Sequence, residues 1–356
     1  MELIRTSLWF RAAALVATVT VVVAAATVSG SATAGAPAAP TAAEVNAGET
    51  VSVVRLGPFV LPSAPTGEMQ VNRPLPNVPK PCEDCYITAI EPRLVTADGK
   101  RADMSTGVMM HHFVVAETAA TDPTCGRNGI GAMGRRLFAS GDERTPIRLP
   151  DGFGFRVRPG PWAGLIELMN HSETPQVVFF ETVVHHVPAS TPGMKAVTPV
   201  WLDVNNCMTS EYAVPTGKSA TAWSWRSSLT GRVVAAGGHV HAGGMGMTLD
   251  NVTTKARICS SRAGYGSGAL DGLVTSMSTC SWDSLGALRA GDKLTLTSMY
   301  DAPKAMGDVM GIMLIAVYET DEVDGGTTAP AWMGRNPQTH VPGGAGHDHG
   351  GGGPGH

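Results

Sequence analysis

The run Val-Val-Phe-Phe-Glu-Thr-Val-Val at residues 177–184 has the length and composition of a β-strand, because β-branched and aromatic residues dominate it. Similar apolar or alternating runs recur along the chain, at 108–115, 164–169, 220–225, 294–299 and 311–318. Turn dipeptides separate them, among them Asp-Gly (98–99), Pro-Gly (159–160 and 192–193) and Thr-Gly (216–217). This pattern predicts an all-β fold of two consecutive antiparallel β-sandwiches of the jelly-roll type.

Changes of composition divide the chain of 356 residues further. The stretch Pro-Ala-Ser-Thr-Pro-Gly (188–193) interrupts the strand-like runs and predicts a boundary between two domains, at 81–190 and 191–323. Residues 37–80 are rich in Pro, Ala and Thr, which predicts a flexible, irregular leading segment. The Gly- and His-rich residues 324–356 predict a disordered tail, for which a metal-sequestering role is an alternative to a solvated one.

Residues 1–36 have the pattern of a signal peptide. Arg5 and Arg11 precede an uncharged Ala- and Val-rich run at 12–28. The following Ser-Ala-Thr-Ala-Gly-Ala (31–36) offers two A-x-A-type cleavage positions, after Ala34 and after Ala36. We therefore expect a secreted, extracytoplasmic protein with no stable membrane insertion after cleavage. An uncleaved anchor is the alternative, although 17 residues is short for a membrane span.

The cysteine count agrees with export. Six cysteines are an even number, and three disulfides are expected in an oxidising compartment. Cys82 and Cys85 form a C-x-x-C motif, but Pro81 precedes it and a strand-like run follows it, so a structural bridge is favoured over thiol redox catalysis. The formal net charge of −4 lacks the basic excess of a nucleic-acid-binding protein, which excludes nucleic acid as the expected partner.

The histidines carry the functional signal. Upstream of the tail there are seven, and six of them occur in close pairs: His111 with His112, His185 with His186, and His239 with His241, with His171 alone. Residues i and i+2 of a strand project to the same face, so the His239-Val240-His241 motif brings two imidazoles together without distortion. Gly237, Gly238 and the Gly243-Gly244 pair leave room around them.

The adjacent pairs are harder to interpret. On a regular strand, His111 and His112 face opposite ways, and both serve one metal only if a bulge or a strand end re-aims one of them. The same holds for His185 and His186. The chain also has 17 methionines, several of them in the segment 299–313. Most methionines pack cores, but a thioether that completes a His-x-His site favours copper over zinc.

Several local motifs occur in the order of one enzyme family. They are Asp103-Met104-Ser105-Thr106 before His111-His112-Phe113, the run Leu-Pro-Asp-Gly-Phe-Gly-Phe-Arg-Val (149–157), His171, His239-Val240-His241, and Asp308-Val309-Met310. From about residue 82 to 318 the chain thereby resembles the ascorbate-dependent type II copper monooxygenases, the group of peptidylglycine alpha-hydroxylating and dopamine beta-monooxygenase. It is similar also to the stress-up-regulated nodulin-type family, through Pro-Cys-Glu-Asp-Cys-Tyr-Ile-Thr (81–88), the residues around His111 and Gly-His-Val-His-Ala-Gly-Gly (238–244).

The resemblance implies two copper ions, one in each domain. His111, His112 and His171 would form an electron-transfer site, and His239, His241 and Met310 would form the catalytic, oxygen-activating site. The implied reaction hydroxylates a C–H bond with O₂ and ascorbate or another reductant as co-substrate. The substrate, a small molecule or a peptide, is not specified.

The chain departs from the peptide-amidating enzymes at the residues that bind peptide. They carry an arginine before the second histidine pair, a tyrosine after the ligand methionine and a glutamine before the third histidine, where this chain has Gly237 with Gly238, Leu314 and Met169. Peptide amidation is therefore not expected. The alternatives are a non-catalytic copper-binding or copper-buffering protein, a zinc hydrolase with an open His₃ site, and histidine pairs that only pack.

Overall fold

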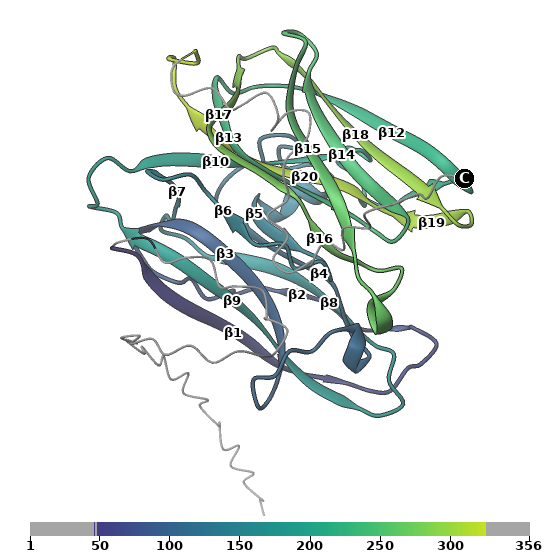
Figure 1. Ribbon diagram of the computed structural model, residues 1–356. Coiled ribbons are helices and arrows are strands. Elements are labelled where there is room, and N and C mark those ends of the chain that lie inside the picture. The colour runs from purple at the N-terminus through teal and green to yellow at the C-terminus, as the bar shows by residue number, and fades with distance from the viewer. Residues whose placement is uncertain (1–45, 47, 325–356) are drawn as a thin grey trace, which may run out of the picture. The chain divides into compact units, whose positions relative to one another are not determined.

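The computed structural model describes residue 46 and residues 48–324. The predicted signal segment, and all of the predicted tail except Asp324, lie outside the described residues. The described part of the chain is built from strands, with three short 3₁₀ helices: η1 Met104–Thr106, η2 Gly129–Met133 and η3 Gly268–Leu270. The prediction of an all-β, sandwich-like fold is confirmed (Figure 1).

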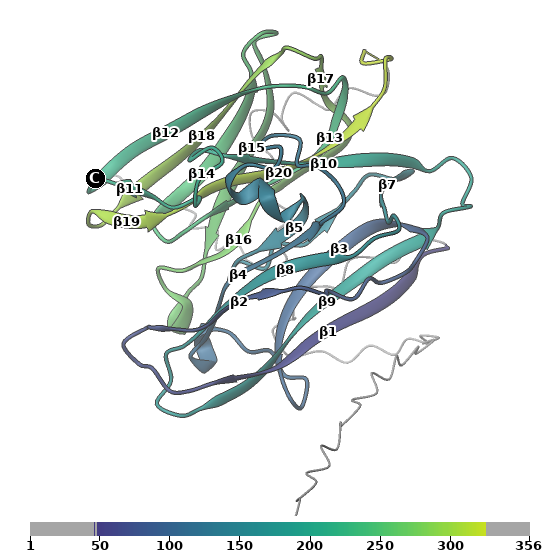
Figure 2. The same cartoon turned by 180° about the vertical axis from the view of Figure 1, so that it is seen from behind.

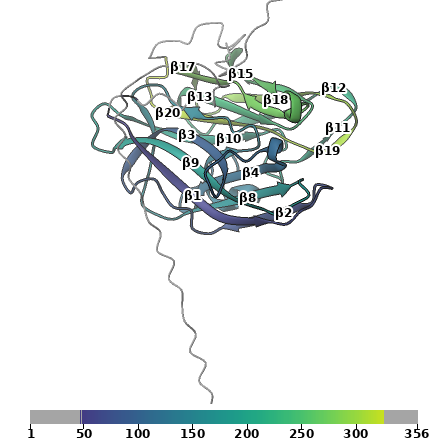
Figure 3. The ribbon, with the colours of Figure 1, turned by 60° about the horizontal axis from the view of Figure 1, so that its bottom comes forward.

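The first sandwich packs a four-stranded antiparallel sheet against one half of a larger sheet. The small sheet has the order β2 (Met69–Leu75), β8 (Trp162–Asn170), β4 (Val108–Glu117) and β5 (Arg135–Ser140), and Figure 3 shows β2, β8 and β4 side by side. The larger sheet contributes β1 (Thr50–Leu61), β9 (Gln176–Pro188), β3 (Cys85–Thr96) and β7 (Phe153–Arg156), with β6 (Ile147–Arg148) paired to β3. The core lies between the two sheets, where the rings of Phe113 and Phe180 are 4.0 Å apart.

The leading segment, predicted to be irregular, contains two strands. β1 pairs with β9 over most of its length, and β2 pairs with β8 at the edge of the small sheet. Phe59 and Leu61 of β1 are buried, so this part of the leading segment belongs to the core of the first sandwich. The prediction was wrong here because prolines and alanines dominate the composition of 37–80 and mask the strand pattern within it.

The second sandwich uses the other half of the larger sheet. That half continues with β10 (Lys195–Asp203), β20 (Gly311–Glu319), β13 (Gly231–Val240) and β17 (Thr279–Leu288). It packs against a sheet of β12 (Gly217–Arg226), β18 (Lys293–Ala302), β14 (Gly244–Asn251), β15 (Ala256–Tyr265) and β16 (Val274–Met277). Two short strands, β11 (Tyr212–Val214) and β19 (Met306–Val309), form a ribbon beside it, which Figure 2 shows from behind.

One continuous sheet connects the two sandwiches. β7 of the first and β10 of the second pair in parallel, with Gly154 opposite Ala196. A third apolar cluster, separate from the two main cores, consists of Val114 of the small sheet and Trp201, Met310, Ile312 and Leu314 of the second sandwich. The small sheet therefore packs directly on β20. The predicted boundary between residues 190 and 191 falls in the connection from β9 to β10 and stays a prediction.

Three disulfides are present among the described residues, as the cysteine count predicted. They join Cys82 to Cys85, Cys125 to Cys207 and Cys259 to Cys280. The second links the segment before η2 to the segment after β10, and so ties the two sandwiches together. Within the described residues, no helix has the length and apolar character needed to span a membrane.

Candidate metal centre

Four of the predicted ligand histidines converge where the two sandwiches meet. His111 and His112 come from β4, His239 lies at the end of β13, and His241 directly follows that strand. One ring nitrogen each of His111, His112 and His241 lie within 4.8 Å of one another. The His239 ring lies 5.3 Å from that of His112 and 5.2 Å from that of His241, measured between centroids.

An irregularity in β4 lets two adjacent histidines face the same way. Met110 pairs with Leu168 of β8, but His112 pairs with Glu167, so one residue of β4, His111, is extra. A bulge of this kind re-aims a side chain that regular pleating would send to the opposite face. Both His111 and His112 consequently reach the same oxygen of Glu167. On the sequence alone, a bulge of this kind or a strand end is required if His111 and His112 are to bind the same metal, and the structure contains the bulge.

His239 and His241 are brought together by the strand geometry that their spacing predicts. Their ring centroids are 5.2 Å apart, on the side of β13 that faces the small sheet. Gly141, in the segment after β5, allows the small sheet to approach β13 closely. A Cβ atom there would lie 2.7 Å from Cε1 of His239 and 2.6 Å from Oε2 of Glu143, so a glycine leaves this space free.

Each of the four imidazoles uses Nδ1 to donate a hydrogen bond to an oxygen. Oε2 of Glu167 lies 3.2 Å from Nδ1 of His111 and 2.7 Å from Nδ1 of His112. Oε1 of Glu143 lies 3.1 Å from Nδ1 of His239, and the backbone oxygen of Asp308 lies 2.9 Å from Nδ1 of His241.

The charge state of the two carboxylates fixes the histidine tautomers. Hydrogen bonds from His111 and His112 lower the pKa of Glu167 to about 2. Burial opposes ionisation of Glu143, but its interaction with His239 lowers the pKa of this carboxyl below its usual value. Ionised carboxylates and carbonyl oxygens only accept hydrogen bonds, so Nδ1 carries a proton in each ring, and a neutral ring then has its lone pair on Nε2.

The resulting arrangement of lone pairs fits a metal ion. Nε2 of His112 and Nε2 of His241 lie 3.3 Å apart, and burial lowers the pKa of His112 to about 4 and that of His241 well below its usual value. Nε2 of His239 is buried and has no hydrogen-bond partner among the described residues. Two nitrogens 3.3 Å apart can both bind one ion, since metal–imidazole bonds are about 2 Å long. Carboxylates that hold Nδ1–H groups in this way are typical neighbours of metal-binding histidines.

Met310 lies next to this centre. It precedes β20, is buried, and lines the same cavity as His112 and His239. The hydroxyl of Tyr300 donates to the backbone oxygen of Met310 at 2.6 Å and accepts from the backbone nitrogen of His241 at 2.9 Å. Tyr300 therefore fixes the positions of two predicted ligands relative to each other.

A cavity of about 260 Å³ adjoins the histidines. Its walls come from both sandwiches and include Val114, Leu165, Trp201, Met310, Ile312 and Leu314. Most of the third apolar cluster therefore forms the wall of a cavity. The combination of an apolar chamber with a few polar groups at one end is typical of a small-molecule site.

His171 is placed elsewhere. Its backbone nitrogen donates to the oxygen of Gly107, and its ring lies against Gly67. Gly107 lies four positions before His111, which is about 13 Å along a strand. The structure thus groups His111 and His112 with His241 instead of His171. This differs from the two separate sites that the resemblance implies, and its cause is the packing of the small sheet on β13 and β20.

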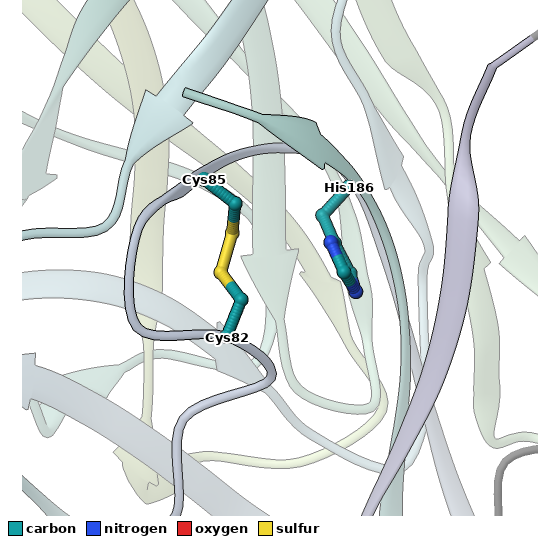
Figure 4. A group of neighbouring side chains, drawn as sticks. All are labelled: Cys82, Cys85 and His186. Carbon is teal, nitrogen blue, oxygen red and sulfur yellow. A yellow bond between two sulfur atoms is a disulfide. The ribbon is translucent and has the colours of Figure 1, made fainter. Parts of the chain in front are cut away.

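A second group of ligand-type side chains, Cys82, Cys85 and His186, lies at the start of β3 (Figure 4). The two sulfur atoms are joined in a disulfide and offer no thiolate, so the structural bridge favoured from the sequence is present. Nε2 of His186 interacts with the hydroxyl of Ser52, and His185 lies on the other side of β9 between Glu49 and Glu91. These two histidines take no part in the centre.

Sequence reasoning missed Glu143, Glu167 and Tyr300. Glu167 left a signal, because it is a single acidic residue in the apolar run 164–169. Tyr300 ends the apolar run 294–299 and has the appearance of a core residue. Glu143 lies in the polar segment Gly-Asp-Glu-Arg-Thr (141–145), where no feature distinguishes it from a solvated loop residue.

The fold and the site define an all-β protein with a histidine centre between two sandwiches. The family described as "Stress up-regulated Nod 19" matches residues 180–320. The "Probable copper-dependent oxygenase M1" of Phoma sp. is 29% identical over 239 residues, which cover 64% of this chain and 60% of that protein. The "Probable copper-dependent oxygenase clz3" of Cochliobolus lunatus is 30% identical over 218 residues, or 58% of this chain and 68% of that protein.

The chain belongs to the family of these probable copper-dependent oxygenases, with a stress up-regulated Nod 19 region in its second half. The comparisons confirm the similarity to copper oxygenases and to the stress-up-regulated nodulin-type family that the sequence motifs indicated. The chain spans about 60% of the length of the Phoma relative.

Proposed function

We propose that this protein is an exported copper-dependent oxygenase that hydroxylates a C–H bond, using O₂ and an external reductant such as ascorbate. The observation that carries the proposal is the set of inward-facing Nε2 atoms beside an apolar cavity. The names of the relatives support copper as the metal. The three disulfides are consistent with an extracytoplasmic location.

Copper would be held by His111, His112, His239 and His241, with the thioether of Met310 as a further ligand. Imidazole and thioether groups suit copper, and the two carboxylates in contact with these histidines, Glu143 and Glu167, already accept hydrogen bonds from them. The proposal places these ligands in one composite centre instead of two distant ones. The role of His171 as a ligand stays a prediction.

When bound, copper supplies the one-electron redox chemistry that activation of O₂ requires. The protein supplies the rest. Glu167, Glu143 and the carbonyl of Asp308 keep the proton on Nδ1 and aim each Nε2 at the metal position. Walls such as Leu165 and Ile312 exclude water from the space next to it, where a substrate C–H bond would be held.

Metal analysis and EPR spectroscopy test the centre. We expect the wild-type protein to bind copper, and His112→Ala and His241→Ala each to lose it. His171→Ala is the matched control, since it removes an imidazole outside the centre. If His171→Ala loses a full copper equivalent and a distinct Cu(II) signal, two separate sites exist and the composite centre is wrong. Recovery of zinc alone under metal-replete expression would exclude the copper oxygenase.

Turnover is tested separately, by O₂ consumption with ascorbate and a panel of substrates. We expect consumption that depends on substrate and is abolished in His241→Ala. Stoichiometric copper binding without any substrate-dependent consumption would instead identify a copper-binding or copper-buffering protein. Export is tested by N-terminal sequencing of the secreted protein, which we expect to begin after Ala34 or Ala36.

A further inference from the structure

We propose that the cavity beside the histidines takes a neutral, largely apolar molecule of one or two rings, and that residue 237 determines how large that molecule can be. The proposal deepens the proposed function by naming the class of its substrate. It rests on that function only for the chemistry that follows binding, because the binding itself depends on the cavity alone.

The residues that line the cavity determine the polarity of the molecule that it can bind. Val114 and Leu165 line the cavity from the first sandwich, and Trp201, Ile312 and Leu314 line it from the second. All five except Leu165 are buried in the folded protein, so these walls face other side chains or the cavity instead of bulk water. Contact with such walls favours apolar surface and disfavours any group that loses its hydrogen bonds to water.

The charges exclude anions. Among the described residues, no lysine or arginine lines the cavity. Its carboxylates are Glu143 and Glu167, whose bonds to the histidines are described above, and Glu211, which is exposed. In the metal-free protein, a carboxylate or phosphate ligand would find no cation among the lining residues to compensate the loss of its hydration and would be repelled by the acidic groups.

A bound cation is disfavoured for a related reason. Glu143 and Glu167 are already occupied by the Nδ1–H groups of three histidines, and the metal would add positive charge at the same end of the cavity. Serine and threonine hydroxyls, among them Ser140, Thr145 and Thr279, offer hydrogen bonds to a neutral hydroxyl or carbonyl group.

The volume of the cavity limits the size of the molecule that it can bind. A dry cavity of roughly 150 Å³ lined by aliphatic and aromatic side chains binds benzene. At about 260 Å³, this cavity accommodates a substituted ring or a pair of fused rings, but not a folded peptide. This agrees with the absence of the peptide-binding arginine, whose place Gly237 and Gly238 take.

Gly237 stands at the point where the cavity can be closed. It lies two residues before His239 on β13, so both residues face the same side of the strand. A Cβ atom built there has a single neighbour within 4 Å, Cγ2 of Thr279 at 3.4 Å, and its backbone needs no left-handed conformation. A larger side chain at 237 therefore extends into the cavity without displacing a ligand histidine.

Three ligands of one size that differ in charge test the class: benzyl alcohol, benzoate and benzylammonium. Binding is measured by isothermal titration calorimetry, with benzoate compared with benzyl alcohol in the metal-free protein and benzylammonium compared with benzyl alcohol in the copper-loaded protein. We expect benzyl alcohol to bind at least tenfold more tightly than either ion. Equal or tighter binding of benzoate or benzylammonium, or no binding of any of the three, would overturn the proposal. Copper content, measured in parallel, reports on the proposed function independently.

Gly237→Val tests the size determinant. We expect at least a tenfold loss of affinity for benzyl alcohol with unchanged copper content. The matched control is Gly286→Val on β17, where a Cβ atom also has its nearest neighbour at 3.4 Å, Cγ1 of Ile258, but outside the cavity. Unchanged affinity in Gly237→Val, or an equal loss in the control, would show that residue 237 does not set the size.

A variant that gains affinity for benzoate provides a second test, because a misfolded protein would not gain binding. Thr279 pairs directly with Gly237 and lines the cavity, so Thr279→Lys introduces a cation beside it. We expect the ratio of benzoate to benzyl alcohol affinity to rise at least tenfold in Thr279→Lys. An unchanged ratio would show that these ligands do not occupy the cavity.

Discussion

Nε2 of His112 lies 3.3 Å from Nε2 of His241, although 129 positions separate the two residues in the chain. Each atom carries a lone pair, because the Nδ1 atoms of both rings donate to oxygens of Glu167 and Asp308. Two such nitrogens repel each other until a cation lies between them. A metal ion bound at this contact would join the two sandwiches, with two of the four histidines supplied by each.

Glu167→Gln is expected to weaken copper binding by about 10- to 100-fold, the usual effect of losing a partner that orients a ligand histidine. Oε2 of Glu167 accepts from both His111 and His112, and an amide oxygen carries too little charge to hold both rings. Competition with a chelator of known affinity measures the change. Glu173→Gln, an exposed site next to β8, is the control, and equal affinities in the two variants would contradict the orienting role.

Tyr300→Phe is expected to lower the free energy of unfolding by about 1–3 kcal/mol, since it leaves the backbone oxygen of Met310 and the nitrogen of His241 without their buried partner. Burial raises the pKa of Tyr300, so its hydroxyl stays protonated and donates at all ordinary pH values. Urea denaturation measures the loss. Tyr265→Phe removes a hydroxyl that donates to the backbone oxygen of Gly244 from a more exposed ring, and it should cost less. A smaller loss in Tyr300→Phe than in this control would refute the prediction.

Asp203→Asn is expected to stabilise the protein above pH 6. Burial raises the pKa of Asp203 from 3.8 to about 6, so the folded state favours the protonated carboxyl. Its contribution to stability is fully present below pH 3.8 and is lost as the pH rises through 6. At pH 8 the asparagine variant should be more stable than the wild type by up to about 3 kcal/mol, and at pH 4 the two should be similar.

Denaturation curves at the two pH values check this dependence. Asp271→Asn, at an exposed position, is the control and should leave the pH profile unchanged. If Asp203→Asn is equally destabilising at both pH values, folding does not raise the pKa of Asp203.

Replacement of Cys125 and Cys207 by serine is expected to lower the free energy of unfolding by about 3–5 kcal/mol, because their bridge closes a loop with a sequence separation of 82. The same change at Cys82 and Cys85, with a separation of 3, should cost less. Chemical denaturation of both double variants tests the order. The reverse order would show that local contacts, and not closure of the long loop, determine the contribution of these bridges.

Much of the fold follows from local pattern. Runs such as 177–184 and 311–318 are strands in the structure because their side chains fit a buried, pleated surface. The strands at 50–61 and 69–75 were missed, since the partners that stabilise them, β9 and β8, lie more than 85 residues later in the chain.

The sequence by itself determined that this is an all-β protein with paired histidines, and that His239 and His241 share one side of a strand, because the period of the pleat is a local property. The tertiary structure alone decided which histidines share a centre. A bulge at His111 and the packing of β4 against β13 and β20 bring His112 to His241 and leave His171 apart. The choice of Glu143 and Glu167 as hydrogen-bond partners depends in the same way on contacts between distant segments, which no local spacing encodes.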